Sequence, residues 1–251
     1  IFQPNCLQDA TGASVTGTVR VEVTEWLKKG DMVFSGMLPM SYGEILVSGG
    51  EIDVRVSKDG NEVFLKPGMT FEAKVPQFGS MDSAMQFFKG DETGNKADRV
   101  NWRLKKNDTI PPPPAIPWIK PYDDSLGIVS DSFRSCNADM FQRELGEWFP
   151  QTFTITVVMK DGSTPAWEDV HVYALLDNFK SVVPQDHKFK NGVVSEDHIP
   201  TMPCHFVAFG LINGHFYGGV VAATPKTGEN YTVTLTEVKP EEFKAQLALY
   251  P

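Results

Sequence analysis

Histidine and cysteine are the residues of this chain whose side chains most readily bind metal ions or transfer protons near neutral pH. The histidines are spread singly over the second half of the sequence: His171, His187, His198, His205 and His215. Cys204 and His205 are adjacent, but neighbouring residues of a strand point to opposite faces, so these two side chains do not share one metal ion. The spacing therefore predicts no metal site and no cofactor.

Nucleophilic and acid–base catalysis also lack a recognisable pattern. The sequence contains no Gly-x-Ser-x-Gly elbow and no serine in a strand-turn-helix context. Paired carboxylates for glycoside hydrolysis could come from Asp123, Asp124, Glu144 and Glu147. Nothing in their spacing sets the separation of about 5 Å or more that this chemistry needs, and we interpret them as solvated acids. We predict no catalytic residues, with a hydrolase whose site lies between two domains as the alternative.

Two tryptophans are the candidate ligand-binding residues. Trp118 lies in a proline-rich segment, and Trp167 lies in a predicted loop after Pro165. Flat indole rings in loops suit the faces of sugars, whereas most tryptophans act as core or interface anchors because each buries a large area. Both interpretations stay open for Trp118 and Trp167.

The three cysteines are too few for a disulfide scaffold. Cys136 and Cys204 both lie in the second half of the chain, and they form the pair most worth testing for a disulfide. Cys6 would then be the odd thiol. The alternative is that all three thiols are free.

Charge and hydropathy exclude two classes of partner. The 251 residues include 23 Lys and Arg against 32 Asp and Glu, a formal net charge of −9. Proteins that bind nucleic acids usually carry a basic surface, so we expect no nucleic-acid partner. No apolar run approaches the roughly 20 residues that a membrane-spanning helix requires.

Alternating apolar and polar residues predict strands in both halves of the chain. Val19, Val21 and Val23 alternate with polar neighbours, and Tyr231, Val233 and Leu235 repeat the pattern near the end. Between these halves, prolines from Pro111 to Pro121 favour a semi-rigid polyproline spacer.

The expected fold is therefore all-β. Two β-sandwich domains of the immunoglobulin or transthyretin type occupy residues 1–109 and 148–251, and a proline-rich linker and connecting segment spans 110–147. A short C-terminal helix begins near Pro240, with Phe243 and Leu247 docking it on the sheet.

Glycines punctuate the first half. The stretch Gly30–Gly36 and the one that follows it, Gly43–Glu51, are interpreted as parts of a β module. Two consecutive glycines, Gly49 and Gly50, permit a bulge or a close backbone approach that a Cβ atom would block. A turn that folding requires is favoured there over a ligand cradle, because no helix start or basic residue follows to hold a phosphate.

Several of these strings resemble a known group of proteins. They include Gly30–Gly36, Leu46–Glu51, Met85–Gly90, Asn101-Trp102 and Ser132–Asn137. Together they are similar to an uncharacterised family of Bacteroidetes-type cell-envelope proteins, often predicted to be lipoproteins. The second half, through Asp161–Pro165, Val170–Tyr173 and Ile199–Pro203, also resembles transthyretin-like or carboxypeptidase-regulatory sandwiches.

The resemblance implies an exported protein, located in the periplasm or at the outer cell surface, with a lipid anchor upstream of Ile1 as one option. It carries no catalytic residues to transfer. We expect a non-catalytic binding or assembly module whose ligand is a polysaccharide or another envelope protein. The alternatives are the interdomain hydrolase and a purely structural spacer.

Overall fold

The computed structural model confirms an all-β, sandwich-like protein, with 57% of its residues in strands and 8% in helices. Two compact units divide the chain. Unit 1 consists of Ile1–Leu27, Ser48–Glu92 and Asn101–Met140, and unit 2 consists of Lys28–Val47, Thr93–Val100 and Phe141–Pro251. The structure describes residues 1–76, 85–92, 100–104, 119–122, 124–141, 151–166, 169–177, 179–185, 189–190, 192–196, 199 and 201–250.

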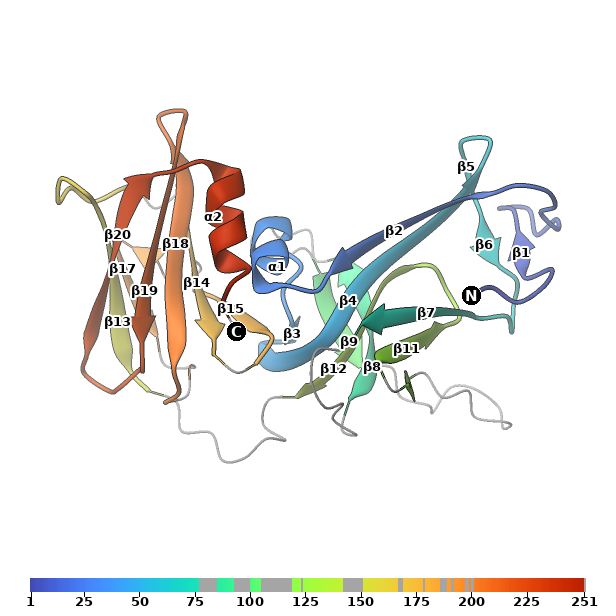
Figure 1. Cartoon of the computed structure of the whole chain (residues 1–251), viewed down its shortest axis with the longest axis horizontal. Helices are drawn as coiled ribbons and strands as arrows, with labels where there is room; N and C mark the ends of the chain where they lie inside the picture. Colours follow the sequence, from blue (N-terminus) through green and yellow to red (C-terminus); the bar gives the residue numbers. More distant parts are fainter. Residues whose placement is uncertain are drawn as a thin grey trace. The chain divides into compact units, whose positions relative to one another are not determined.

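Unit 1 is built mainly from two sheets (Figure 1). The larger sheet has the order β2-β4-β12-β8-β9, and the smaller sheet has the order β10-β11-β7. Their strands are β2 (Arg20–Trp26), β4 (Glu44–Lys58), β7 (Phe71–Pro76), β8 (Gln86–Glu92), β9 (Val100–Leu104), β10 (Ile119–Pro121), β11 (Ser125–Ser130) and β12 (Arg134–Phe141). Short strands complete the unit: β1 (Leu7–Gln8) pairs with β6 (Phe64–Leu65), and β5 (Asn61–Glu62) pairs with β4.

The core of unit 1 follows the period of two that strands impose. Ile52, Val54 and Val56 of β4 face one way and pack with Val75 of β7 and Leu126 of β11. Gly50 adopts φ +143°, and a Cβ atom built there would lie 2.5 Å from a Val75 methyl carbon. Both glycines lie inside strand β4, so the turn favoured for them is wrong. The close approach that glycine permits is present instead, since a Cβ atom at Gly49 would lie 2.6 Å from the Ala138 carbonyl oxygen.

Part of the predicted connecting segment is sheet. Strands β10, β11 and β12 all lie within the range 110–147 that the sequence suggested as linker, and unit 1 includes them up to Met140. Leu126 and Ile128 of β11 are fully buried, because alternate residues of that strand face the core. The proline-rich stretch 105–118, the boundary at 109 and the boundary at 148 lie outside the described residues, and these boundaries stay predictions.

The interpretation of Gly30–Gly36 as part of a β module is wrong. Residues Lys29–Ser35 form helix α1, and Gly36 ends it in the left-handed conformation at φ 71°. Met32 and Val33 are buried. The local apolar pattern suits a strand as well as a helix, and packing in unit 2 selects the helix. After α1, β3 (Met40–Ser41) pairs with the first residues of β4.

Unit 2 contains an eight-stranded sheet with the order β15-β14-β18-β19-β20-β13-β17-β16. Its strands are β13 (Phe153–Met159), β14 (Val170–Leu176), β15 (Ser181–Pro184), β16 (Phe189–Lys190), β17 (Val193–Glu196), β18 (Cys204–Ile212), β19 (His215–Ala223) and β20 (Asn230–Glu237). Only two residue pairs, Tyr217–Glu237 and Gly218–Thr236, join β19 to β20. Residues from both sides of this junction fill one core, including Phe153 of β13 and Phe206 of β18.

The expected C-terminal helix is present as α2 (Pro240–Leu247), with Phe243 and Leu247 buried. Helix α1 packs beside α2 (Figure 1). A Cβ atom at Gly30 would lie 2.7 Å from the carbonyl oxygen of Lys244, and the Lys244 ammonium is 2.9 Å from the Asp31 carboxylate. The first half of the chain therefore contributes a helix to the second unit.

Candidate functional site

Of the candidate residues from the sequence, the structure describes the two cysteines and not the two tryptophans. Trp118 and Trp167 lie outside the described residues. Cys136 is buried in the core of unit 1 and Cys204 in that of unit 2, and both are free thiols. Within the described ranges, no group of three or more His, Cys, Asp or Glu residues could hold a metal ion.

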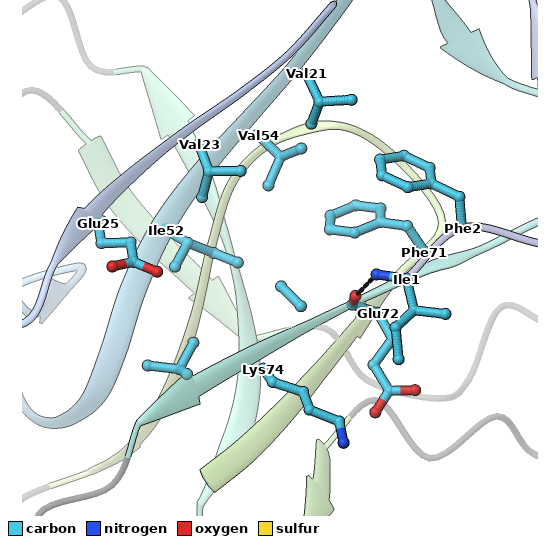
Figure 2. Close-up of a pocket in the computed structure, with 12 residues that line it drawn as sticks. Ile1, Phe2, Val21, Val23, Glu25, Ile52, Val54, Phe71, Glu72 and Lys74 are labelled. Carbon is cyan, nitrogen blue, oxygen red and sulfur yellow. Dashed lines mark hydrogen bonds between the residues drawn. The ribbon is translucent and has the colours of Figure 1, made fainter. Parts of the chain in front are cut away.

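A groove in unit 1 is the candidate functional site (Figure 2). Its volume is about 380 Å³, within the range of pockets that bind ligands. Strands β2, β4 and β7 line it together with the N-terminal residues: Ile1, Phe2, Val21, Val23, Glu25, Ile52, Val54, Phe71, Glu72, Ala73, Lys74 and Val75. The buried side chains of Ile52 and Val54 form part of its apolar lining.

One wall of the groove is the edge strand β2. Among the described residues, β2 pairs only with β4, so its other edge is unpaired. Val21 and Val23 face the groove, and they are 41% and 53% exposed. Natural sheets usually protect such edges with charges or cover them, so apolar residues beside an open edge favour an interaction with another chain.

The opposite wall is β7, and a short piece of extended chain already pairs with it. The Ile1 ammonium donates to the Glu72 carbonyl oxygen at 2.6 Å, and the Glu72 amide donates to the Ile1 carbonyl oxygen at 2.9 Å. Phe2 forms an antiparallel bridge with Phe71, and the two rings stack at 6.0 Å between centroids. Residues Ile1 and Phe2 thus occupy one end of the edge by strand pairing.

Charged side chains of β7 lie on the face turned away from the apolar lining (Figure 2). Tyr122 donates a short hydrogen bond to the Glu72 carboxylate, and the Lys120 ammonium is 3.2 Å from it. The hydrogen bond from Tyr122 lowers the pKa of Glu72 more than any other contact of this carboxylate. The Lys74 ammonium sits 4.0 Å from the centroid of the Tyr122 ring. Glu72 is therefore neutralised by a nearby cation, whereas Lys74 has no ion pair among the described residues.

A second cluster in unit 1 contains two buried carboxyl groups, Glu51 and Asp139. The Asn137 amide donates to both, at 3.4 Å to Glu51 and through a short bond to Asp139. Burial, and after it the charge of Asp139, raise the pKa of Glu51 well above its usual value. These groups have no exposed surface, so we interpret the cluster as part of the interior rather than as a catalytic site.

A third cluster lies in unit 2 around Lys29. Its ammonium donates to the Leu176 carbonyl oxygen at 2.5 Å, and burial lowers its pKa to about 8. His205 Nδ1 is 2.8 Å from the Asp177 carboxylate. Burial raises the pKa of the neighbouring Cys204 thiol to about 12, so this thiol is not an activated nucleophile.

Sequence reasoning missed the groove. Val21 and Val23 did carry a signal, because their alternation predicted a strand with one apolar face. That face was expected to be buried, and the sequence does not show that β7 leaves it partly uncovered. A strand at a sheet edge has the same alternation as a strand in its middle.

Comparisons with known proteins found no match to this chain. No family model matches the chain, and neither a curated protein nor a solved structure was found that matches it. Among the described residues, no helix is long and apolar enough to cross a membrane.

Proposed function

We propose that this chain is a non-catalytic binding or assembly protein whose first unit binds a segment of another protein in the groove between β2 and β7. The observation that carries the proposal is the exposure of Val21 and Val23 beside two strand edges. Among the described residues, the edge of β2 is unpaired and that of β7 pairs only with Ile1 and Phe2. Backbone edges pair with polypeptide and not with sugar. The exposed lining residues Val21 and Val23 are aliphatic and the Phe71 ring is buried, whereas a sugar site would offer exposed flat rings. Of the two ligand classes expected from the sequence, protein is therefore favoured over polysaccharide.

The chemistry of the described clusters supports a binding role over a catalytic one. The buried carboxyls of Glu51 and Asp139 have no exposed surface, and the Cys204 thiol is held protonated by burial. A catalytic group must reach its substrate. The groove itself offers one carboxylate on its β2 side, Glu25, and no titratable group forms a hydrogen bond or ion pair with it in the described part of the chain.

A peptide-display selection tests the proposal. The probe is a library of random twelve-residue peptides, selected on the immobilised full chain. We expect enriched peptides whose affinity falls at least about tenfold in Val23→Lys, because a charge replaces an apolar contact at the groove. Leu211→Lys is the matched control, since Leu211 is an apolar strand residue of unit 2 with 62% exposure.

Two outcomes would overturn the proposal. Enriched peptides that bind Val23→Lys as well as the unchanged protein would place the interaction elsewhere. If a glycan array yields ligands while the peptide library yields none, the polysaccharide class is favoured. Loss of that glycan binding in Trp167→Ala would then show that Trp167 is involved, and retention would show that it is not.

Location in the cell envelope, in the periplasm or at the outer surface, is also a proposal, and it depends on the resemblance of sequence strings alone. Fractionation of the producing cells tests it, and recovery of the protein from the cytoplasm would contradict it.

A further inference from the structure

The backbone N–H and C=O groups of β7 point alternately toward the groove and toward β11. This alternation fixes the register in which another strand could pair with β7. In an antiparallel pair, alternate residues direct both backbone groups to the same neighbouring strand. Glu72 exchanges both of its bonds with Ile1, so the N–H and C=O of Lys74, two residues on, also face the groove. The intervening residues Phe71, Ala73 and Val75 direct theirs toward β11.

The pairing made by Ile1 and Phe2 covers only the first third of β7. Ile1 is 71% exposed, and a segment held by a few contacts opens at little cost. Phe2 contributes one ring, which lies against Phe71 and Phe133 with centroids 6.0 and 5.9 Å away. A longer strand with an aromatic residue at this position would reproduce both contacts and extend the pairing to Lys74.

We propose that the groove binds an extended segment that adds as a strand antiparallel to β7, in the place of Ile1 and Phe2, with the pattern apolar, acidic, apolar, any residue, aromatic. This inference rests on the proposed function and names the chemistry of its ligand. The occupant is a segment of a different protein.

Each position of the pattern follows from the residue opposite it. Side chains directly opposite each other in a pair share a face. The residues opposite Val75 and Ala73 therefore point into the groove, toward Val21 and Val23, and must be apolar. The residue opposite Lys74 lies on the outer face beside an ammonium that contacts the Tyr122 ring and forms no ion pair within 4.0 Å in the described ranges, so an acid fits there. The residue opposite Phe71 replaces the ring of Phe2.

The test uses a blocked heptapeptide, Ser-Val-Glu-Val-Thr-Phe-Ser, titrated into the full chain and followed by fluorescence anisotropy. Replacing the peptide glutamate by lysine should weaken binding by roughly fivefold, because an opposite-charge pair becomes a like-charge pair. The variant Lys74→Glu should reverse this preference. Ionic strength is held at about 0.15 M, where charges more than about 8 Å away are largely screened, so the net charge of −9 contributes little.

Methylation of single peptide amides decides whether the ligand binds as a strand. N-methylation of the glutamate removes a hydrogen bond to Lys74 and should weaken binding by about tenfold. N-methylation of the valine opposite Ala73 should change affinity by less than about twofold, because that amide points away from β7. The variant Phe2→Ser should strengthen binding about threefold or more, because the competing segment is weakened.

Failure of this inference is distinguishable from failure of the proposed function. If library peptides bind in a manner sensitive to Val23→Lys but the heptapeptide does not bind, or if both methylated peptides bind equally, strand addition in this register is wrong and a groove-binding protein ligand remains. If the chain self-associates without peptide and Val23→Lys abolishes this, a second copy is the occupant and the present inference is wrong. If no peptide of either kind binds, both proposals are wrong.

Discussion

The two units differ in what covers the apolar side chains that lie beyond their cores. In unit 2, helices α1 and α2 cover aromatic side chains of β18 and β19. Phe34 of α1 stacks on Phe209 of β18 at 5.1 Å between ring centroids, and Phe243 of α2 packs beside Phe216 of β19. In unit 1, Val21 and Val23 of β2 face the groove and remain about half exposed (Figure 2). Apolar surface that the chain covers contributes to stability, whereas apolar surface left open is available for binding.

This difference can be measured because each unit holds a buried thiol that reports on it, Cys136 in unit 1, which also contains Cys6, and Cys204 in unit 2. Alkylation of Cys136 reports the unfolding of unit 1, and alkylation of Cys204 reports that of unit 2. Mass spectrometry of the two cysteine peptides after a short pulse of reagent, at increasing urea, gives a free energy of unfolding for each unit. The same spectra would reveal a Cys136–Cys204 disulfide, which would appear as a linked peptide pair.

The largest expected effect comes from the covered surface of unit 2. Phe243→Ala removes a buried ring that lies near Phe34, Phe209 and Phe216, and we expect unit 2 to lose about 3 kcal/mol or more of unfolding free energy. Earlier alkylation of Cys204 in urea, with Cys136 unchanged, is the expected result. Equal loss at both thiols would mean that the units do not unfold separately and would break the comparison.

The next effect concerns the end of the groove where β4 and β7 come together. Gly50→Ala places a methyl group 2.5 Å from a Val75 carbon at a φ that only glycine adopts freely. We expect unit 1 to lose about 2 kcal/mol, seen as earlier alkylation of Cys136. Gly12→Ala is the control, since Gly12 has φ +87° and nothing within 4 Å, and it should cost roughly 1 kcal/mol. A loss at Gly50 no larger than at Gly12 would show that crowding against Val75 does not matter.

A pH effect should appear in unit 1 through Glu51. Its folded pKa is raised by burial, so the folded state keeps a proton that the unfolded state has lost. The resulting stability is fully present below the unfolded value of about 4.5 and is lost as pH rises through the raised folded pKa. Between the unfolded and the folded pKa the slope of the unfolding free energy should approach about −1.4 kcal/mol per pH unit.

Glu51→Gln should remove that slope and stabilise unit 1 at neutral pH, because a neutral amide, unlike the ionised carboxylate of the unfolded chain, does not have to take up a proton on folding. Urea unfolding between pH 5 and 8, followed by fluorescence and checked by pulse alkylation at the upper end, measures it. An unchanged slope in Glu51→Gln would assign the pH dependence to another group.

The smallest effect on stability is expected at the groove itself. Val23→Ser should change the unfolding free energy of unit 1 by less than about 0.5 kcal/mol, because the side chain is already 53% exposed. The same substitution should weaken peptide binding severalfold. A stability loss comparable to that of Phe243→Ala would mean that Val23 belongs to the core, and the contrast between the units would disappear.

The sequence predicted the strand content well and the location of the site poorly. Alternation at Ile52, Val54 and Val56 correctly predicted a strand that buries these three side chains, although Asp53 on its other face is buried as well. Pro240 with Phe243 and Leu247 correctly predicted α2. Local patterns record which residues avoid water, and both elements depend on little else.

What the sequence did not predict depends on contacts between distant segments. Lys29–Ser35 became a helix because it packs beside α2, more than 200 residues later in the chain. The groove exists because β7 pairs with β11 on one edge and leaves the other edge to Ile1 and Phe2. The alternation of apolar and polar residues within a single segment does not determine this strand order.

Hydrogen exchange at the Lys74 amide tests the central claim most directly. In the free protein this amide faces the groove and has no hydrogen-bond partner among the described residues, so it should exchange quickly. The Ala73 amide is directed toward β11 and should be protected. On adding the heptapeptide, we expect protection of Lys74 to rise at least tenfold while that of Ala73 changes little. A bound peptide that leaves Lys74 exchange unchanged would contradict strand addition at this edge.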